Sequence, residues 1–176
     1  MGLTLITPPT EYPVTRTEAK THCRIDGSDE DALVDGLIAA ASEYVEQYTG
    51  RSLLGQTWKL TLDEFSDSIL LPRGPVQSAT VKYYDASGVE QTASTDLYTL
   101  DAASDPAWIV RNDSETWPGT LDAVNVVSVT FIAGYETVPV PIKQAILLLV
   151  AQWYDDRTGW QPHVVDALLA NYRAFS

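Results

Sequence analysis

IKQAILLLVAQWY, residues 142–154, is the stretch that decides the fold. Every residue from Ala145 to Ala151 is apolar, so a helix here has no polar face through its middle turns. Such a helix is either buried or membrane-spanning, and the run is far shorter than the roughly 18 to 20 residues that a span requires. Pro139 and Pro141 precede it, and proline is tolerated in a first helical turn. We therefore expect a central buried helix over residues 141–156.

The composition is that of a globular chain with an acidic surface. Of 176 residues, 45% are hydrophobic and 20% are charged, and the formal net charge is -13. A length of this order suits one domain with a large insertion. Binding duplex DNA by neutralising phosphates requires a surface of lysine and arginine, so we exclude that class of function.

Cysteine usage and the start of the chain bear on its compartment. Cys23 is the only cysteine, which excludes an intrachain disulfide and a cysteine-rich zinc site. The first residues carry neither a charged segment nor a long apolar segment typical of a secretory signal. We expect a protein that is made and kept in a reducing, soluble compartment.

Two helices are expected near the N-terminus, after an extended, proline-rich arm over residues 1–14. Thr15 to Glu18 fits a capping box, which predicts a short helix through about Arg24. Acidic residues after Ser28 suit the positive end of a helix dipole. Apolar residues then recur with helical spacing up to Gly50, a natural stop. The second helix is predicted over residues 29–49.

The middle of the chain has strand character. Trp58, Leu60 and Leu62 alternate with polar residues, which is strand periodicity. Further short strands, bounded by turn residues, are predicted at 69–71, 79–84, 89–92, 97–100, 108–111 and 124–133. This spacing is typical of a small antiparallel sandwich or barrel.

The order of helices, strands and helices predicts an α+β fold, in which a helical body carries an inserted β domain. Residues 1–54 are expected to form the N-terminal arm and helices of the body, and residues 55–137 the β domain. Residues 138–176 are expected to return to the body, with a last helix at about 163–174.

No stretch supports catalysis or metal binding. His22 and Cys23 are adjacent in a helix and face different directions, and nothing in the sequence brings His163 to Cys23. The acidic stretch that begins at Asp26 lacks the glycine and glutamate of a calcium loop. Phosphate-binding glycine motifs and metalloprotease motifs are absent. We predict that the chain is not an enzyme and uses no cofactor or metal.

Interaction residues gather at the C-terminus. Tyrosine, tryptophan, arginine and phenylalanine dominate protein interfaces, which makes Trp160, Tyr172, Arg173 and Phe175 candidate contacts with a partner. They serve equally well as caps on the chain's own core, and the sequence leaves both interpretations open.

Several motifs, in this order and spacing, resemble the head–tail connector (adaptor) proteins of tailed phages, which also occur in phage-derived gene transfer agents. The resemblance spans residues 15–157 and is strongest for longer members with a β insertion. The motifs are DEDAL at 29–33, AAASEYVEQYTGR at 39–51, QTW at 56–58, LPRGPV at 71–76, VKYYD at 81–85, VP at 138–139, IKQAILL at 142–148 and WY at 153–154.

The resemblance implies a role in a virion or gene transfer agent particle, made in the bacterial cytoplasm. Such adaptors form a ring of about twelve subunits beneath the portal protein, extend the DNA channel, and receive a stopper or tail-completion protein. In the family the C-terminal segment commonly reaches the portal, which would assign Trp160, Tyr172, Arg173 and Phe175 to that interface.

A ring lined with carboxylates would repel DNA phosphates and let the genome slide without specific binding. As a hypothesis, some of the acidic residues of the second helix and the loop before it line this channel; an ordinary solvated surface is the alternative. The candidates are Asp29, Glu30, Asp31, Asp35 and Glu43.

Two other classes of function stay open. The chain could be a monomeric binding module that recognises a ligand through Trp58, Trp108 or Trp117 of the β domain, although such aromatic residues more often fill small cores. An enzyme with a His/Asp site ranks last. Cyclic assembly would favour the structural role over both.

Overall fold

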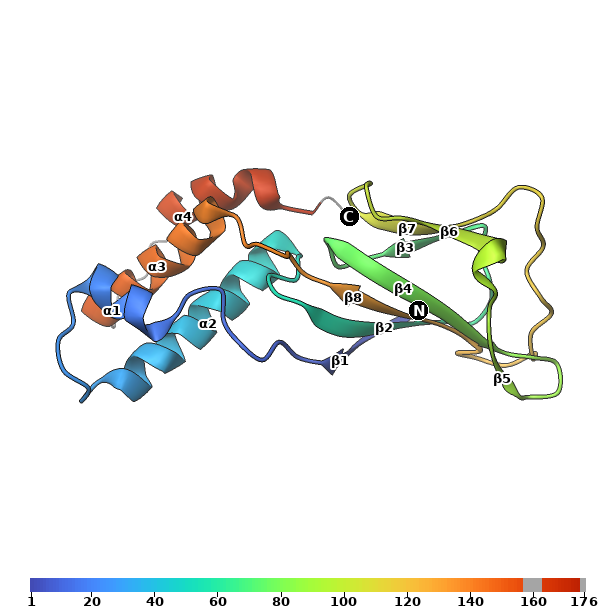
Figure 1. Cartoon of the computed structure of the whole chain (residues 1–176), viewed down its shortest axis with the longest axis horizontal. Coiled ribbons are helices and arrows are strands. Elements are labelled where there is room, and N and C mark those ends of the chain that lie inside the picture. The colour runs from blue at the N-terminus through green and yellow to red at the C-terminus, as the bar shows by residue number, and fades with distance from the viewer. Residues whose placement is uncertain (157–162, 175–176) are drawn as a thin grey trace. The chain divides into compact units, whose positions relative to one another are not determined.

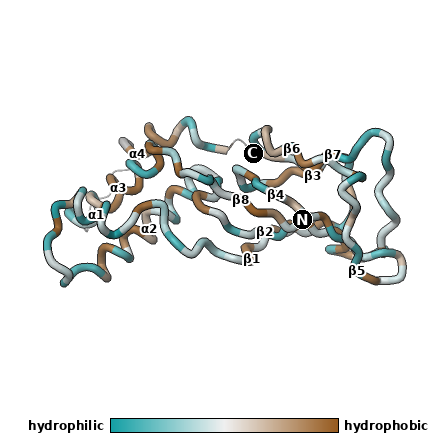
Figure 2. The backbone as a smooth tube through the Cα atoms, in the orientation of Figure 1, coloured by the Kyte–Doolittle hydropathy of each residue, from teal (hydrophilic) through white to brown (hydrophobic). Residues whose placement is uncertain are grey.

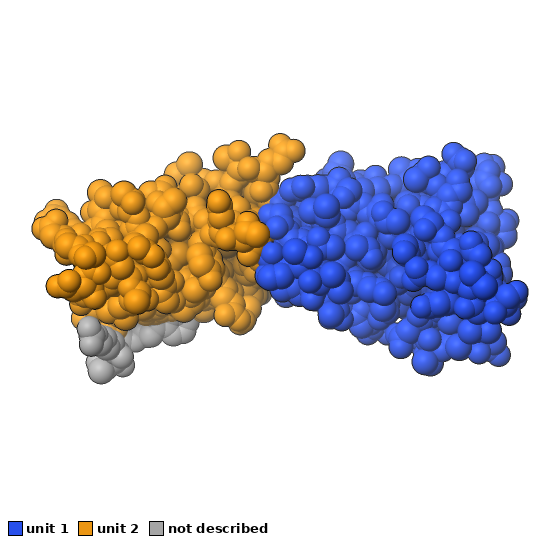
Figure 3. Space-filling view, turned by 60° about the horizontal axis from the view of Figure 1, so that its bottom comes forward, with its two compact units in different colours: residues 1–8, 55–134, 175–176 blue, residues 9–54, 135–174 orange. Residues whose placement is uncertain are grey.

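The computed structural model describes residues 1–156 and 163–174. Within them the chain divides into two compact units, coloured separately in Figure 3. The helical unit comprises residues 9–54 and 135–174, and the β unit comprises residues 1–8 and 55–134. Helices and antiparallel sheets are segregated between the units, which confirms the predicted α+β class.

Four α-helices and a 3-10 turn make up the described part of the helical unit (Figure 1). They are α1 (Arg16–Cys23), α2 (Asp31–Thr49), α3 (Val140–Asp155), α4 (His163–Leu169) and η2 (Ala170–Tyr172).

The capping box of α1 and the glycine stop of α2 form as predicted, whereas α2 begins at Asp31, two residues later than predicted, and its N-cap Glu30 makes no side-chain capping bond. The Glu18 amide donates to the Thr15 hydroxyl at 3.2 Å, and the Thr15 amide donates to the Glu18 carboxylate at 2.7 Å, so the capping box is complete. At the end of α2, Gly50 has φ 70°, a left-handed conformation that glycine adopts without strain. Both ends of this two-helix segment are therefore determined locally.

The buried helix is α3. Ile142, Ala145, Ile146, Leu149 and Val150 are fully buried and contact the core face of α2. Leu147, Leu148 and Trp153 are half-buried against the same core, which accounts for the missing polar face. None of the described helices is long and apolar enough to cross a membrane.

The β unit contains two antiparallel sheets. The larger sheet has the order β1 (Gly2–Thr7), β2 (Gln56–Leu62), β8 (Val127–Ala133), β4 (Val76–Tyr84) and β5 (Glu90–Thr92). The smaller sheet has the order β3 (Ser68–Leu71), β7 (Ala107–Arg111) and β6 (Tyr98–Asp101), and the 3-10 turn η1 (Thr95–Leu97) precedes β6.

Both sheets share one core, so the β unit is a sandwich. Leu60 and Phe131 of the larger sheet and Leu71 and Ile109 of the smaller one belong to a single cluster, and each is at most 1% exposed. Figure 2 shows hydrophobic segments along the strands of both sheets. The alternation predicted for β2 is confirmed, and in both β2 and β8 it arises because one face lies in the core and the other outside.

The first residues differ from the expectation. The sequence predicts an extended arm of the helical body, but residues 2–7 form β1, the edge strand of the larger sheet. Leu3 lies opposite Leu60 and Leu5 lies opposite Trp58, so strand pairing with β2 holds this segment in the β unit. The prolines that suggest an arm begin only at Pro8, after the strand has ended.

Candidate assembly surfaces

The acidic start of α2 is tied to α1 by ion pairs. Arg16 donates through Nε to Asp35 Oδ1 at 2.7 Å and through Nη1 to Asp31 Oδ2 at 3.1 Å, and a second contact with Asp35 makes that pair bidentate. Lys20, one turn further along α1, binds the other oxygen of Asp31 at 2.5 Å and also the Gly27 carbonyl. Two cations of α1 therefore hold two of the candidate carboxylates.

These pairs change the protonation behaviour of the carboxyl groups. The hydrogen bond from Lys20, supported by the charge of Arg16, holds the pKa of Asp31 below its ordinary value. The hydrogen bond from Arg16 does the same to the pKa of Asp35 and raises the pKa of Arg16 itself. Both aspartates therefore stay ionised in moderate acid.

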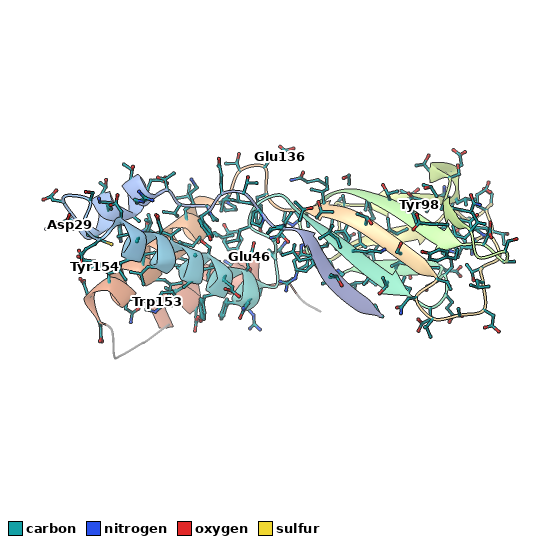
Figure 4. All side chains as sticks on the ribbon, turned by 90° about the horizontal axis from the view of Figure 1, so that it is seen from below. Asp29, Glu46, Tyr98, Glu136, Trp153 and Tyr154 are labelled. Carbon is teal, nitrogen blue, oxygen red and sulfur yellow. The ribbon has the colours of Figure 1, made fainter. Side chains whose placement is uncertain are left out.

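The remaining acidic candidates have other surroundings. Asp29, labelled in Figure 4, is exposed in the loop before α2. Glu30 accepts a hydrogen bond from the Tyr154 hydroxyl of α3. Glu43 is exposed and accepts a hydrogen bond from the Gln47 amide at 3.1 Å. The five candidates thus divide into two ion-paired residues, one that bonds a tyrosine, and two that are exposed to solvent.

The end of the described chain packs against the end of α2. The Ala174 amide donates to the Thr49 carbonyl at 2.7 Å, and Arg51 Nε donates to the Tyr172 carbonyl at 2.5 Å. The Arg173 guanidinium lies 5.4 Å from the centre of the Tyr48 ring, within the range of a cation–π contact. Tyr172 and Arg173 are thereby positioned by their own unit, whereas the candidates Trp160 and Phe175 lie outside the described residues.

Sequence reasoning missed the partners in these contacts. Arg16 and Lys20 lie four residues apart, on one face of α1, so their spacing alone is a signal for a cationic face of that helix. The partners of the tail, Thr49 and Arg51, act partly through backbone groups, for which the sequence carries no signal.

The β-unit aromatic residues proposed for ligand binding have contacts within their own unit. Trp117 stacks on Phe65 with ring centres 4.3 Å apart and donates through its indole nitrogen to the Ser66 carbonyl at 3.0 Å. The Arg73 guanidinium lies 5.1 Å from the centre of the Trp58 ring. Trp108 is half-buried on β7. These contacts favour a structural role for Trp58 and Trp117.

Cys23, one of the residues considered for catalysis, has a protonation behaviour that does not suit a nucleophile. Burial, with a smaller effect of the Asp155 charge, raises the pKa of the Cys23 thiol, which disfavours the reactive thiolate. The His163 side chain, its conceivable partner, lies outside the described residues. In the part of the chain that the structure describes, no three histidine, cysteine, aspartate or glutamate residues are grouped so as to hold a metal ion.

Solved structures from gene transfer agent (GTA) particles share this fold along the whole chain. Two chains, from the neck of an empty GTA particle with C6 symmetry and from the virion of a native GTA particle, are each 25% identical with a TM-score of 0.82. A third, from the neck of a native GTA particle with C12 symmetry, is 24% identical with a TM-score of 0.76. Each match covers 100% of this chain and 97% of the other. No curated protein sequence matches the chain.

The fold is thus that of structural proteins from the necks of such particles. The family model of the phage gp6-like head–tail connector proteins matches residues 15–107, more than half of the sequence. The chain belongs to this family of structural connector proteins, as the motifs in its sequence indicated.

Proposed function

We propose that the chain is a connector subunit at the head–tail interface of a phage or gene transfer agent particle. Copies of it form a ring beneath the portal protein, extend the DNA channel and receive the stopper or tail-completion protein. The role is structural and requires no catalysis. The observation that carries the proposal is the match of the whole fold to neck proteins, added to the family match over residues 15–107.

The symmetry of the related particles supports a ring. The necks with this fold were solved with C6 and C12 symmetry, and twelve copies are compatible with both. Closed cyclic assembly requires that each subunit offer two different surfaces, one for each neighbour. A chain that divides into two compact units has ample surface for both contacts.

The C-terminal segment is the proposed contact with the portal. Arg173 is exposed although its guanidinium rests on Tyr48, and the backbone bond from Ala174 to Thr49 holds this segment at the end of α2. An exposed arginine in a defined position is a favourable interface anchor. Trp160 and Phe175 belong to the same proposal on the sequence alone.

The acidic residues of α2 and of the loop before it are the proposed channel wall. Asp31 and Asp35 contribute less negative potential than their number suggests, because Arg16 and Lys20 neutralise them. Asp29 and Glu43 are exposed and are the strongest candidates for repelling DNA. Glu30 is a weaker candidate than these two, because it accepts a hydrogen bond from Tyr154.

Imaging of the particle neck tests the proposed function. Particles should be purified from cells that carry the intact gene and from cells in which it is deleted. We expect a ring of copies between portal and tail in the first case, and DNA-filled heads without attached tails in the second. A single copy per particle, or a neck that lacks the chain altogether, would refute the proposal.

A further inference from the structure

The two sheets of the sandwich differ in the charged residues that their strands carry. The strands of the larger sheet contain Glu90 as their only acidic residue, in a chain with 24 of them, and they also contain Lys59 and Lys82. The Lys82 ammonium donates to the Glu90 carboxylate at 2.9 Å, which cancels that negative charge. With that pair neutral, Lys59 leaves the strands of this sheet with a net positive charge.

The strand register places both lysines on the outer face of the larger sheet. Lys59 lies opposite Thr130, which lies opposite Thr80, whereas the neighbouring row of Leu60, Val129 and Val81 is fully buried in the core. Ile132, in the central strand, is 40% exposed on the same outer face. Hydroxyl groups cover most of the remainder: Thr4, Thr57, Thr61, Ser78, Thr80, Thr92 and Thr130.

The outer face of the smaller sheet has the opposite character. Asp101 of β6 lies opposite Trp108 of β7, on the side of the strands that points away from the core. Val110, in the central strand of this sheet, is 40% exposed. Asp96, in η1 before β6, and Asp105, in the loop before β7, are exposed as well.

The one cation in the strands of the smaller sheet does not offset this acidity. Arg111 donates through Nε to Asp67 at 2.8 Å, which lowers the pKa of that carboxyl, and through Nη1 to the Asn112 and Glu115 carbonyls. The charge of Arg111 is thus neutralised by Asp67 at the end of β7. The sandwich therefore has a face with lysines and hydroxyl groups on one side and an acidic face on the other.

We propose that the outer face of the larger sheet in one copy packs against the outer face of the smaller sheet in the next copy. Ile132 and Val110 supply the apolar centre, Lys59 faces the carboxylates of Asp96, Asp101 and Asp105, and Lys82 keeps Glu90 of the same face neutral. The proposal rests on the proposed function, because it assigns the two neighbouring surfaces of a ring.

Charge and symmetry favour a second copy as the occupant. Two copies with a net charge of -13 repel each other, so a stable contact places the lysine-bearing face of one copy against carboxylates of the other. The faces lie on opposite sides of one sandwich, so the same contact repeats head to tail, and such an interface closes into a ring when its rotation allows.

Cross-linking within the neck tests the contact. Particles should carry the full chain with Cys23→Ser, Ile132→Cys and Val110→Cys, and be treated with a short bis-maleimide before denaturing electrophoresis. We expect a ladder of multimers of the chain from the double variant and none from either single variant. The matched control carries Val89→Cys and Val140→Cys, also at exposed valines, and should give no ladder.

The outcomes separate the two proposals. A ring in the neck without a ladder, or cross-links to a different neck protein, would overturn the assignment of these faces and leave the connector role intact. A neck without any ring of this chain would overturn both. As a second measurement, Lys59→Glu with Lys82→Glu should reduce the number of copies per particle, and Lys59→Gln with Lys82→Gln should reduce it less. Unchanged copy number in both would count against the interface.

Discussion

At the scale of single residues, Arg16 is the side chain on which the start of the helical unit depends. Its planar guanidinium binds Asp35 with two nitrogens and reaches Asp31 with a third contact, a geometry that lysine cannot reproduce. The pairs are partly exposed, with side-chain exposure of 47% for Arg16 and 26% for Asp31. Their stabilisation is accordingly modest and screened by salt.

Replacing Arg16 should reveal a stability difference that depends on pH. The pKa of Asp31 and that of Asp35 are lowered in the folded chain, so the pairs stabilise it above the ordinary aspartate pKa, and this contribution is lost as pH falls through the folded values. Arg16→Gln should lower the melting temperature at neutral pH, and the difference from the parent chain should shrink in strong acid. Calorimetric melting across this pH range measures it.

The matched control is Arg24→Gln, which removes the same charge from an exposed position just after α1. It should change the melting temperature less than Arg16→Gln at neutral pH. An Arg16→Gln effect of the same size at neutral and acid pH would show that the ion pairs are not its cause.

At the scale of elements, α3 organises the helical unit. It contacts α1, α2 and α4, and its fully buried residues make up a large part of the core. A helix of this kind forms because it buries apolar area against several neighbours, and its own propensity contributes less. Damage to α3 should therefore loosen the whole helical unit.

Leu149→Ala tests this role. Leu149 is 0% exposed, and removing a buried leucine side chain typically costs about 2–5 kcal/mol, including the cavity that remains. Urea unfolding followed by helix circular dichroism should show a loss in this range. Leu148→Ala, at the adjacent half-buried position, should lose clearly less. Equal losses in the two variants would mean that the core is not where the structure places it.

At the scale of the whole molecule, the described chain enters each unit twice, in the order β unit, helical unit, β unit, helical unit. Residues 1–8 and 55–134 build one unit, and the segments that follow each of them build the other. Each unit has its own hydrophobic core. A connector that meets several partners at once can thus assign different contacts to different units.

Neutralising exposed acids of α2 and of the loop before it tests the proposed channel wall. Asp29→Asn with Glu43→Gln removes two exposed charges without touching the ion pairs of Arg16. We expect slower DNA delivery, or DNA retained in otherwise empty particles, because less charge repels the phosphates. Delivery kinetics from purified particles measure this effect.

Asp122→Asn with Glu136→Gln is the control, since it removes the same charge from other exposed positions. It should leave DNA delivery unchanged. If the α2 variant delivers DNA at the parent rate, Asp29 and Glu43 belong to a solvated outer surface.

A substitution in the C-terminal segment tests the proposed portal contact. Arg173→Ala removes an exposed guanidinium that rests on Tyr48, and the backbone bond from Ala174 to Thr49 remains possible. We expect weaker binding to the portal ring of the same particle, measured by co-sedimentation, with little change in melting temperature. Arg24→Ala should not alter portal binding. A lower melting temperature with unchanged binding would assign Arg173 to the chain's own core.

Much of the fold was predictable because its signals are local. The capping box at Thr15, the stop at Gly50 and the apolar run of α3 each depend on residues within a few turns. β1 was not predictable in this way, because its identity as a strand depends on pairing with β2, fifty or more residues further along the chain. The prolines that follow β1 suggest an extended arm instead. The candidate acids were recognised by type, but their different environments depend on side chains from α1 and α3.

The sequence by itself determined the α+β class, the burial of α3, and the family to which the chain belongs. Hydrophobic periodicity and the order of motifs are properties of the sequence, so they can be recognised without knowing which residues are in contact. Only the tertiary structure decided that Arg16 and Lys20 neutralise two carboxylates of α2, and that Lys59 and Lys82 share one face of the sandwich. Strand register and helix packing bring together residues that lie far apart in the sequence. Electrostatic interactions depend on the distance between charges in space, so they could not be predicted from the sequence.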